Sequence, residues 1–251
     1  MNGHIIYSAG HTDALKYTQE RMQQHGYGFV SRPDPSVTHL LLDVPSFAPD
    51  GTLRSGGVLE DILNILNKEI TVIGGNLSHP ALCKYKTVDL LQDPVYLAAN
   101  ADITAHCAIK LATNNLPITL NGCPVLILGW GRIGKCLARL LRNLGAKVTV
   151  AARKETDRAI LLALGYDTAA PAALDRELSK YRIIFNTAPT MLLPKEAVSY
   201  CNANCLKIDL ASTRGIAGDD VLWARGLPGK DAPESSGALI AQTILRLDVA
   251  T

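Results

Sequence analysis

Residues 129–134, GWGRIG, limit what this chain can fold into more than any other segment. They follow the apolar run 125–129 and precede residues 132–145, whose leucines lie on one helical face. In a strand–turn–helix of this kind, the first glycine permits the tight turn and the second lets a ligand approach the backbone. The third lets the helix pack closely on the strand, and the helix start offers free N–H groups to phosphates. We therefore predict a dinucleotide site at Gly129, Trp130, Gly131, Arg132, Ile133 and Gly134.

The next predicted strand, KVTVAAR at 147–153, ends without an acidic residue. NAD sites of this type place a carboxylate there to bind the ribose 2′-hydroxyl, and a carboxylate would repel a 2′-phosphate. Here Arg153 and Lys154 follow two alanines, and Arg132 in the glycine turn offers a third cation. A guanidinium binds phosphate oxygens in pairs. This charge match favours NADP over NAD, although Arg153 and Lys154 are also explained as solvated cations at a strand end.

Two more predicted strands end in polar residues. Residues 182–189 finish with Asn186, Thr187, Ala188 and Pro189, which we expect to contact the cofactor because ligands bind at the carboxyl ends of parallel strands. An ordinary turn explains the same residues. Residues 205–212 contain Asp209, which is either a functional carboxylate or the cap of a turn, and both interpretations remain open.

The chain divides into two α/β halves. Apolar runs at 4–10, 27–30, 39–45 and 70–75 alternate with helical patterns, which predicts a parallel sheet in a smaller N-terminal domain. We place this domain at residues 1–92, a long helix and connector at 93–121, and the nucleotide-binding domain at 122–251. The predicted helix 233–247 packs either within the nucleotide-binding domain or back on the N-terminal domain, and both arrangements remain open.

Composition excludes several classes of function. The net charge is +2 and no basic run is interleaved with aromatic residues, so we expect no nucleic-acid partner. No window holds the roughly 20 apolar residues of a membrane span, and the N-terminus lacks the pattern of a signal peptide. Six cysteines without a C-x-x-C pair are typical of reduced cytosolic thiols. We therefore expect a cytoplasmic protein with no metal site, and a homodimer or higher even oligomer as the default assembly.

Several motifs together carry a family resemblance. DPVYLAANADITAHCAIKLA, VLILGWGRIGKCLARLLRNLGAKVTVAARK, IIFNTAP, LKIDLAS and GLPGKDAPESSGALIAQTI resemble the A subunit of dipicolinate synthase over residues 90–247. The resemblance implies a doubly wound Rossmann domain beside a flavodoxin-like N-terminal domain. It also implies an NADP-linked oxidoreductase that makes dipicolinate, the spore dicarboxylate, from a dihydrodipicolinate-type substrate during sporulation. A flavoprotein-like B subunit is the implied partner.

The substrate side rests on fewer signals. A dicarboxylate needs donors, and Lys230 with the helix start at Ser235 and Ser236 offers them. Lys230 is equally explained as a surface lysine. Asn100 and Thr104 share a face of the long helix and are candidate substrate contacts. His106 is a candidate proton donor or acceptor, although a histidine on the helix surface is the simpler interpretation.

Two other functions compete with this one. The first is another NADP-linked dehydrogenase, of the shikimate or 2-hydroxyacid type. A 2-hydroxyacid dehydrogenase would need a histidine in the second half, and no histidine follows His106. The second is a non-catalytic NADP-binding module that regulates a partner, because no clear general acid or base is marked in the sequence.

Overall fold

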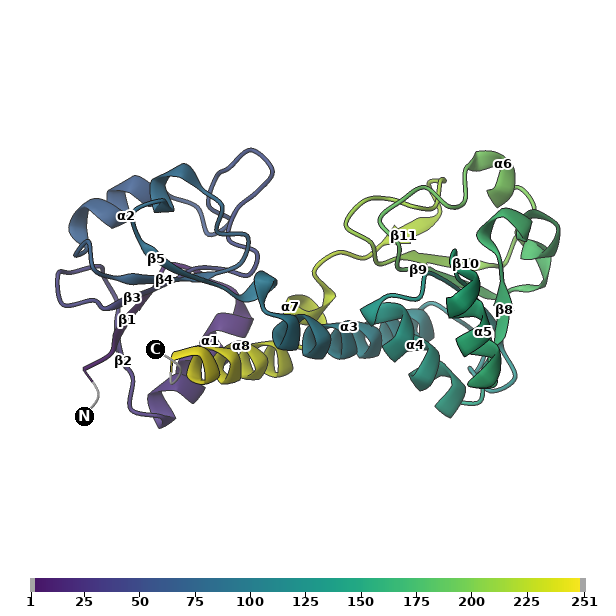
Figure 1. Cartoon of the computed structure of the whole chain (residues 1–251), viewed down its shortest axis with the longest axis horizontal. Coiled ribbons are helices and arrows are strands. Elements are labelled where there is room, and N and C mark those ends of the chain that lie inside the picture. The colour runs from purple at the N-terminus through teal and green to yellow at the C-terminus, as the bar shows by residue number, and fades with distance from the viewer. Residues whose placement is uncertain (1–2, 249–251) are drawn as a thin grey trace. The chain divides into compact units, whose positions relative to one another are not determined.

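The computed structural model describes residues 3–248 and divides the chain into two compact units (Figure 1). Unit 1 comprises residues 1–100 together with 228–251, and unit 2 comprises residues 101–227. This division differs from the predicted boundaries, because the C-terminal helix is grouped with the first unit and not with the nucleotide-binding domain. Residues 1–2 and 249–251 of the predicted domains lie outside the described residues.

Unit 1 is built on a five-stranded sheet in which every pairing is parallel. The strand order β2-β1-β3-β4-β5 is that of flavodoxin-like folds, so the predicted flavodoxin-like domain is confirmed. The strands are β1 Ile5–Ser8, β2 Gly28–Val30, β3 His39–Leu41, β4 Thr71–Gly74 and β5 Lys86–Asp89.

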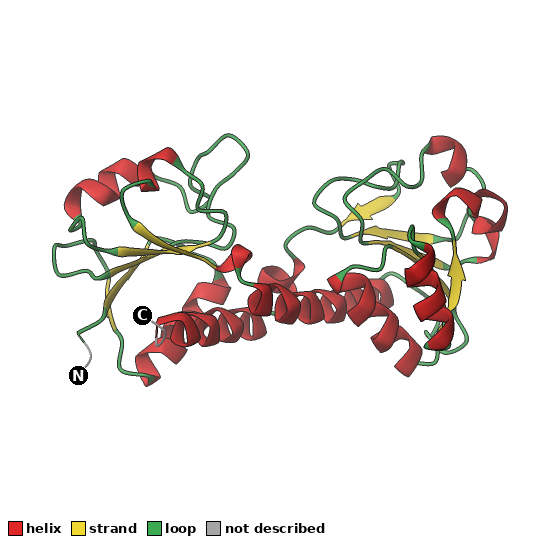
Figure 2. Ribbon diagram, in the orientation of Figure 1, coloured by secondary structure: helices red, strands yellow, loops and turns green. Residues whose placement is uncertain are grey.

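Helices cover both faces of this sheet (Figure 2). Helices α1 (Asp13–Gln24) and α8 (Pro233–Asp248) lie on one face, and α2 (Leu59–Ile65) lies on the other. Neighbouring residues of β3 point to opposite faces: Leu40 packs in the core under α2, whereas Leu41 packs in the core with α1 and α8. Both faces are buried, which explains why β3 reads as a continuous apolar run.

The close packing of α8 on α1 explains why the C-terminus belongs to unit 1. A Cβ at Gly237 would lie 2.2 Å from the carbonyl oxygen of Ala14, so the two backbones approach more closely than a side chain allows. The buried hydroxyl of Thr18 donates to the carbonyl of Gly237 over 3.2 Å. Ile240 and Ile244 then complete the apolar core on this face. This contact joins residues more than 200 positions apart, and it is the packing on the N-terminal domain that the sequence left open for this helix.

A long helix, α3 (Pro94–Asn114), contains the boundary between the units at residue 100. Asp93 caps its start, because the Asp93 carboxylate accepts a 2.6 Å hydrogen bond from the backbone N–H of Tyr96. The same carboxylate pairs with Arg246 of α8 over 2.5 Å. Residues 90–92 precede the helix as a short 3-10 turn, Leu90–Gln92. None of the described helices is both long and apolar enough to cross a membrane.

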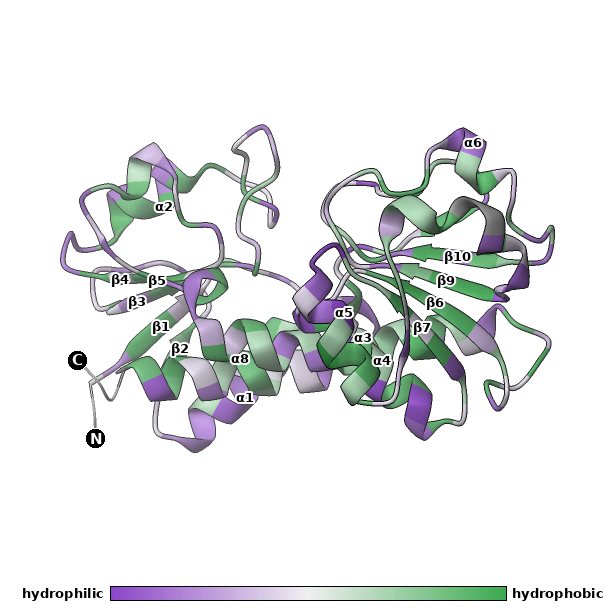
Figure 3. Cartoon of the chain, turned by 45° about the vertical axis from the view of Figure 1, so that its right-hand side comes forward, coloured by the Kyte–Doolittle hydropathy of each residue, from purple (hydrophilic) through white to green (hydrophobic). Residues whose placement is uncertain are grey.

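Unit 2 has a six-stranded parallel sheet with the order β11-β10-β9-β6-β7-β8. This is the doubly wound Rossmann order, so the predicted fold is confirmed. The two central strands, β6 and β9, are apolar except for Asn186 at the end of β9 (Figure 3). The strands are β6 Pro124–Leu128, β7 Lys147–Ala151, β8 Asp167–Ala169, β9 Ile183–Asn186, β10 Leu206–Asp209 and β11 Val221–Trp223. The helices are α4 Arg132–Asn143, α5 Glu155–Ala163 and α6 Lys195–Val198, and α7 (Leu227–Asp231) joins the two units in sequence.

Candidate functional site

The order of strands in unit 2 reverses between β6 and β9, which lie side by side at the centre of the sheet. Ligands of open α/β sheets bind outside the carboxyl ends of the strands at such a switch point. The glycine turn follows β6, and the turn 186–189 follows β9, so both predicted cofactor segments meet at this edge.

Two of the three glycines are required by the protein itself. Gly129 has a positive φ of 106°, and a Cβ there would lie 2.7 Å from the Thr187 hydroxyl. A Cβ at Gly134 would lie 2.3 Å from the carbonyl oxygen of Gly129. Gly131 differs, because nothing lies within 4 Å of where its Cβ would be. The backbone at Gly131 therefore faces open space, as a site for a pyrophosphate requires.

The first turn of α4 adds a favourable field for an anion. Gly131 is its N-cap, no side chain caps the helix, and no acidic residue lies in the first turn. The free N–H groups and the helix dipole therefore favour a phosphate. Arg132 is exposed and Ile133 is half-buried. The Lys135 ammonium lies 5.7 Å from the centre of the Trp130 ring, which also forms a T-shaped contact with Tyr166. These residues fit a bound dinucleotide.

The loop between β7 and α5 presents the predicted phosphate-binding cations. Arg153 and Lys154 are both exposed. The guanidinium of Arg158 donates to the carbonyls of Ala152 and Arg153 over 2.8 and 2.9 Å, which fixes the loop that carries Arg153. No sequence pattern selects Arg158, because its contacts depend on how α5 returns to the loop.

The turn after β9 is held mainly by its own polar groups. The Asn186 amide is fully buried, donates to Asp209 over 2.8 Å and exchanges hydrogen bonds with the backbone of Ala188. The Thr187 hydroxyl donates to the carbonyl of Leu128 over 3.0 Å and so ties β9 to β6. Asn186 and Thr187 therefore position the edge of the site, while Ala188 is half-buried and Pro189 is exposed.

Asp209 is completely buried, and four donors surround its carboxylate. One oxygen accepts from Asn186 and the backbone N–H of Ala211, and the other accepts from the N–H groups of Gly215 and Ile216 at 2.7 and 3.2 Å. A carboxylate offers about four acceptor positions, so the protein uses all of them. This geometry favours a role in holding the loop after β10 over the catalytic role that the sequence suggested for Asp209.

The candidates on α3 lie in different surroundings. Thr104 is buried and Asn100 is half-buried. His106 is exposed and lies 3.7 Å from the Asp102 carboxylate, which also pairs with Arg139 over 3.0 Å. This exposure agrees with the simpler interpretation of His106 as a residue of the helix surface.

The remaining candidates, Lys230, Ser235 and Ser236, belong to unit 1. Lys230 is exposed on the five-residue helix α7. Ser235 is exposed, but Ser236 is buried at the start of α8, one residue before the close approach at Gly237. Ser236 is thus part of the α1–α8 packing.

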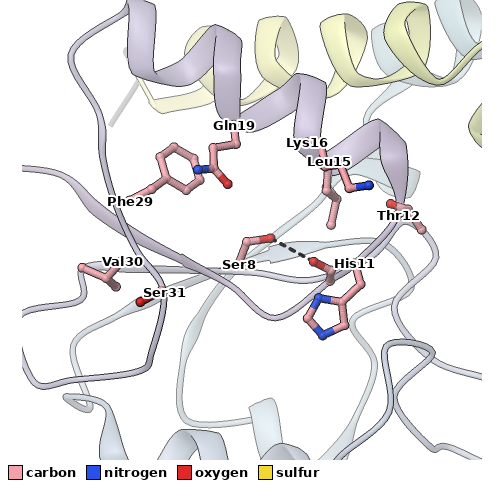
Figure 4. A pocket seen from close by; sticks show the side chains of 10 residues that line it. Ser8, His11, Thr12, Leu15, Lys16, Gln19, Phe29, Val30 and Ser31 are labelled. Carbon is pink, nitrogen blue, oxygen red and sulfur yellow. Dashed lines mark hydrogen bonds between the residues drawn. The ribbon is translucent and has the colours of Figure 1, made fainter.

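Unit 1 has a cavity of about 400 Å³ at the carboxyl ends of β1 and β2 (Figure 4). Gln19 and Lys16 of α1 border it on one side and Ser8 and His11 on another, and Phe29 supplies an apolar wall. Its size is typical of small-molecule sites. None of the predicted site residues lies in this cavity.

Asp43 contacts the loop 10–12, which borders the cavity. It is buried and accepts a 3.2 Å hydrogen bond from the Thr12 hydroxyl. Burial raises the pKa of the Asp43 carboxyl, and hydrogen bonds from Thr12 oppose this increase. A Cβ at Gly10 would lie 2.6 Å from the Asp43 carboxylate, so glycine is needed there for packing.

Two thiols, Cys201 and Cys205, interact just before β10. They lie at the amino ends of the unit 2 strands, whereas the glycine turn lies at the carboxyl ends. A hydrogen bond from Cys205 lowers the pKa of Cys201 to about 7, and the positive charge of Lys207 contributes. The same hydrogen bond raises the pKa of Cys205. Lys207 is buried and pairs with exposed Asp220 over 2.8 Å. All six cysteines are free, and the described residues contain no cluster of ligands suited to a metal ion.

The fold and the glycine turn define the class of protein: an α/β protein of two units whose second unit has the NAD-binding fold of dehydrogenase-type oxidoreductases. Residues 96–204 match the family described as D-isomer specific 2-hydroxyacid dehydrogenase, NAD binding domain. This match indicates a nicotinamide cofactor.

Both the sequence relatives and the solved structures include the A subunit of dipicolinate synthase. The A subunit of dipicolinate synthase from Bacillus subtilis (strain 168) is 31% identical over 175 residues, which span 66% of this chain and 59% of that protein. Crystal structures of the same synthase component from Bacillus halodurans and Bacillus subtilis share the fold, with TM-scores of 0.85 and 0.82 at 21% and 22% identity. They cover 98% and 100% of this chain and 97% of each relative. The resemblance to the dipicolinate synthase family that the motifs predicted is confirmed.

Proposed function

We propose that the protein is an NADP-dependent oxidoreductase that acts on a cyclic dicarboxylate of the dihydrodipicolinate type. The observation that carries the NADP assignment is the end of β7, where Arg153 and Lys154 are exposed and no acid precedes them. The positions that would bind the 2′-hydroxyl of NAD are the buried Ala151 and Ala152. The site therefore lacks the group that selects NAD and has cations that suit a 2′-phosphate.

The local charge balance supports this assignment. The segment 153–158 has three cations, Arg153, Lys154 and Arg158, and two acids, Glu155 and Asp157, so its net charge is +1 (three minus two). Both acids belong to the first turn of α5, where they interact favourably with the helix dipole. Arg158 is held by two backbone carbonyls, which leaves Arg153 as the principal phosphate ligand.

Held at Gly131 and the start of α4, the nicotinamide cofactor would supply a hydride acceptor for a ring carbon of the dihydropyridine dicarboxylate. The ring also releases a proton and becomes aromatic, so two electrons and two hydrogens leave the substrate. The chain's residues bind the pyrophosphate at Gly131 and α4, orient the cofactor across β6 and β9, and neutralise the substrate's carboxylates. Lys230, Asn100 and Thr104 remain candidate substrate contacts in this proposal.

The relative's name designates one subunit of a synthase and extends the proposal to a second, B-type partner. Assembly as an even oligomer is proposed separately, because symmetric dimers are the commonest assemblies. A 2-hydroxyacid dehydrogenase is less well supported, because the last histidine of the chain, His106, is exposed on α3 and pairs with Asp102. A non-catalytic NADP-binding module predicts the same cofactor affinity without turnover.

A titration with NADPH and NADH at one salt concentration, followed by nicotinamide fluorescence, tests the assignment. We expect tighter binding of NADPH, and Arg153→Ala should weaken it about 10- to 100-fold, since a hydrogen bond to a charged group contributes about 1.5–3 kcal/mol. NADH affinity should change little. Arg32→Ala, at an exposed arginine of unit 1, serves as the matched control. Equal affinities for the two cofactors in the wild-type protein would refute the NADP assignment.

A further inference from the structure

The loop after β10 is fixed more firmly than a surface loop requires. Asp209 binds the backbone N–H groups of Gly215 and Ile216. The carbonyl of Gly215 accepts hydrogen bonds from the N–H groups of Leu192 and Leu193 at 2.8 and 3.0 Å. A Cβ at Gly215 would lie 2.4 Å from the Asn186 amide, so even alanine does not fit. Buried polar groups thus fix the position of the residue before Gly215, which is Arg214.

Arg214 forms one side of a cationic cluster on an indole ring. Its guanidinium carbon lies 5.0 Å from the centre of the Trp223 ring, and that of Arg225 lies 5.3 Å from the same centre. The Trp223 ring is itself anchored, because its N–H donates to the carbonyl of Ala211 over 3.0 Å. Arg214, Trp223 and Arg225 are all exposed.

In the described part of the chain, neither guanidinium has an acidic partner, because no carboxylate forms an ion pair with Arg214 or Arg225. Arg139 of α4 and Arg246 of α8 both have acidic partners. Two like charges on one ring repel each other, and an anion between them would relieve this repulsion.

The position of the cluster indicates which anion it serves. The proposed NADP phosphate contacts lie after β7, on one side of the switch point between β6 and β9. A dinucleotide crosses this point, so its nicotinamide end extends toward β9 and β10. Arg214 follows β10, Trp223 ends β11 and Arg225 lies two residues further on, so all three lie on the β9–β11 side of the switch point.

We propose that Arg214, Trp223 and Arg225 form the carboxylate-binding part of the substrate site in unit 2, with one guanidinium for each carboxylate of a planar cyclic dicarboxylate. This inference rests on the proposed function, which it extends to the substrate contacts. Each guanidinium offers paired donors to a carboxylate, and the anchored Trp223 ring holds both guanidiniums by cation–π contact. The two cations therefore select a dicarboxylate over the matching monocarboxylate.

Binding measurements on the protein saturated with NADP⁺ test this inference without turnover. The probes are pyridine-2,6-dicarboxylate and pyridine-2-carboxylate, titrated by calorimetry in metal-free buffer. We expect the dicarboxylate to bind at least about 10-fold more tightly than the monocarboxylate. Arg214→Gln and Arg225→Gln should each weaken dicarboxylate binding about 10-fold, equivalent to roughly 1.4 kcal/mol, and remove most of the preference.

Matched variants separate this inference from the proposed function. Arg142→Gln removes an arginine that stacks on Tyr166 at 4.5 Å, elsewhere in unit 2, and should leave dicarboxylate affinity unchanged. Arg214→Lys and Arg225→Lys should restore part of the affinity by restoring the charge. NADP⁺ affinity is measured for every variant and should not change. Equal binding of the two probes, or unchanged dicarboxylate affinity in both Gln variants, would overturn the inference. The NADP⁺ affinity is measured separately, so a normal value would show that the cofactor assignment still holds.

Discussion

Asp209→Asn distinguishes a structural carboxylate from a catalytic one. The substitution keeps one oxygen for Asn186 and Ala211, but places an amide NH₂ where the carboxylate accepts from Gly215 and Ile216. Two buried backbone N–H groups then lose their acceptor. Each costs about 1–3 kcal/mol, so the free energy of unfolding of unit 2 should fall by about 2–6 kcal/mol.

Tryptophan fluorescence during urea unfolding measures this loss in the relevant unit, because both tryptophans of the chain, Trp130 and Trp223, lie in unit 2. Asp219→Asn, at an exposed position of the same loop region, should change stability by no more than about 0.5 kcal/mol. An Asp209→Asn protein that is inactive yet loses less than about 1 kcal/mol would refute the structural role and restore Asp209 as a catalytic candidate.

Three further perturbations have defined outcomes. Gly131→Ala should leave the Tm nearly unchanged and weaken NADPH binding, because a Cβ at this position meets no other atom of the protein. Gly134→Ala should lower the Tm, because its Cβ would collide with the carbonyl oxygen of Gly129. Equal losses of Tm in the two variants would contradict this. Burial raises the pKa of Asp43 in the folded state above the unfolded value, so this group's contribution to stability is lost as pH rises through the folded pKa. Asp43→Asn should therefore raise the Tm at pH 7 and lose that advantage below about pH 4; a lower Tm at pH 7 would disprove it. Asp220→Asn, which leaves the buried Lys207 ammonium without its acid, should destabilise unit 2 more than Lys207→Met does, as urea unfolding would reveal.

The features that could be predicted from the sequence are those that local chemistry determines. The glycine turn is recognisable because Gly129 and Gly134 meet only atoms of their own strand–turn–helix and the neighbouring strand end. The edge strands β8 and β11 have three residues each and were not predicted, whereas the equally short β2 and β3 were predicted from the apolar runs 27–30 and 39–45 that contain them. Arg158 and Arg214 were missed because their importance depends on hydrogen bonds made by other segments. The partners of Asp209 include a residue 23 positions away in sequence, and for this reason the sequence could not decide between a functional carboxylate and the cap of a turn.

The construction of unit 1 from both ends of the chain has a consequence for synthesis on the ribosome. Residues 101–227 are contiguous, so unit 2 has all of its core as soon as they emerge. The first 100 residues, although made earlier, lack α8 until residues 233–248 have been made, and Ile6, Leu15 and Met22 stay without the isoleucines that cover them until then. Unit 1 is thus begun before unit 2 but completed after it, and a nascent chain stalled before residue 233 exposes an apolar helix face to chaperones.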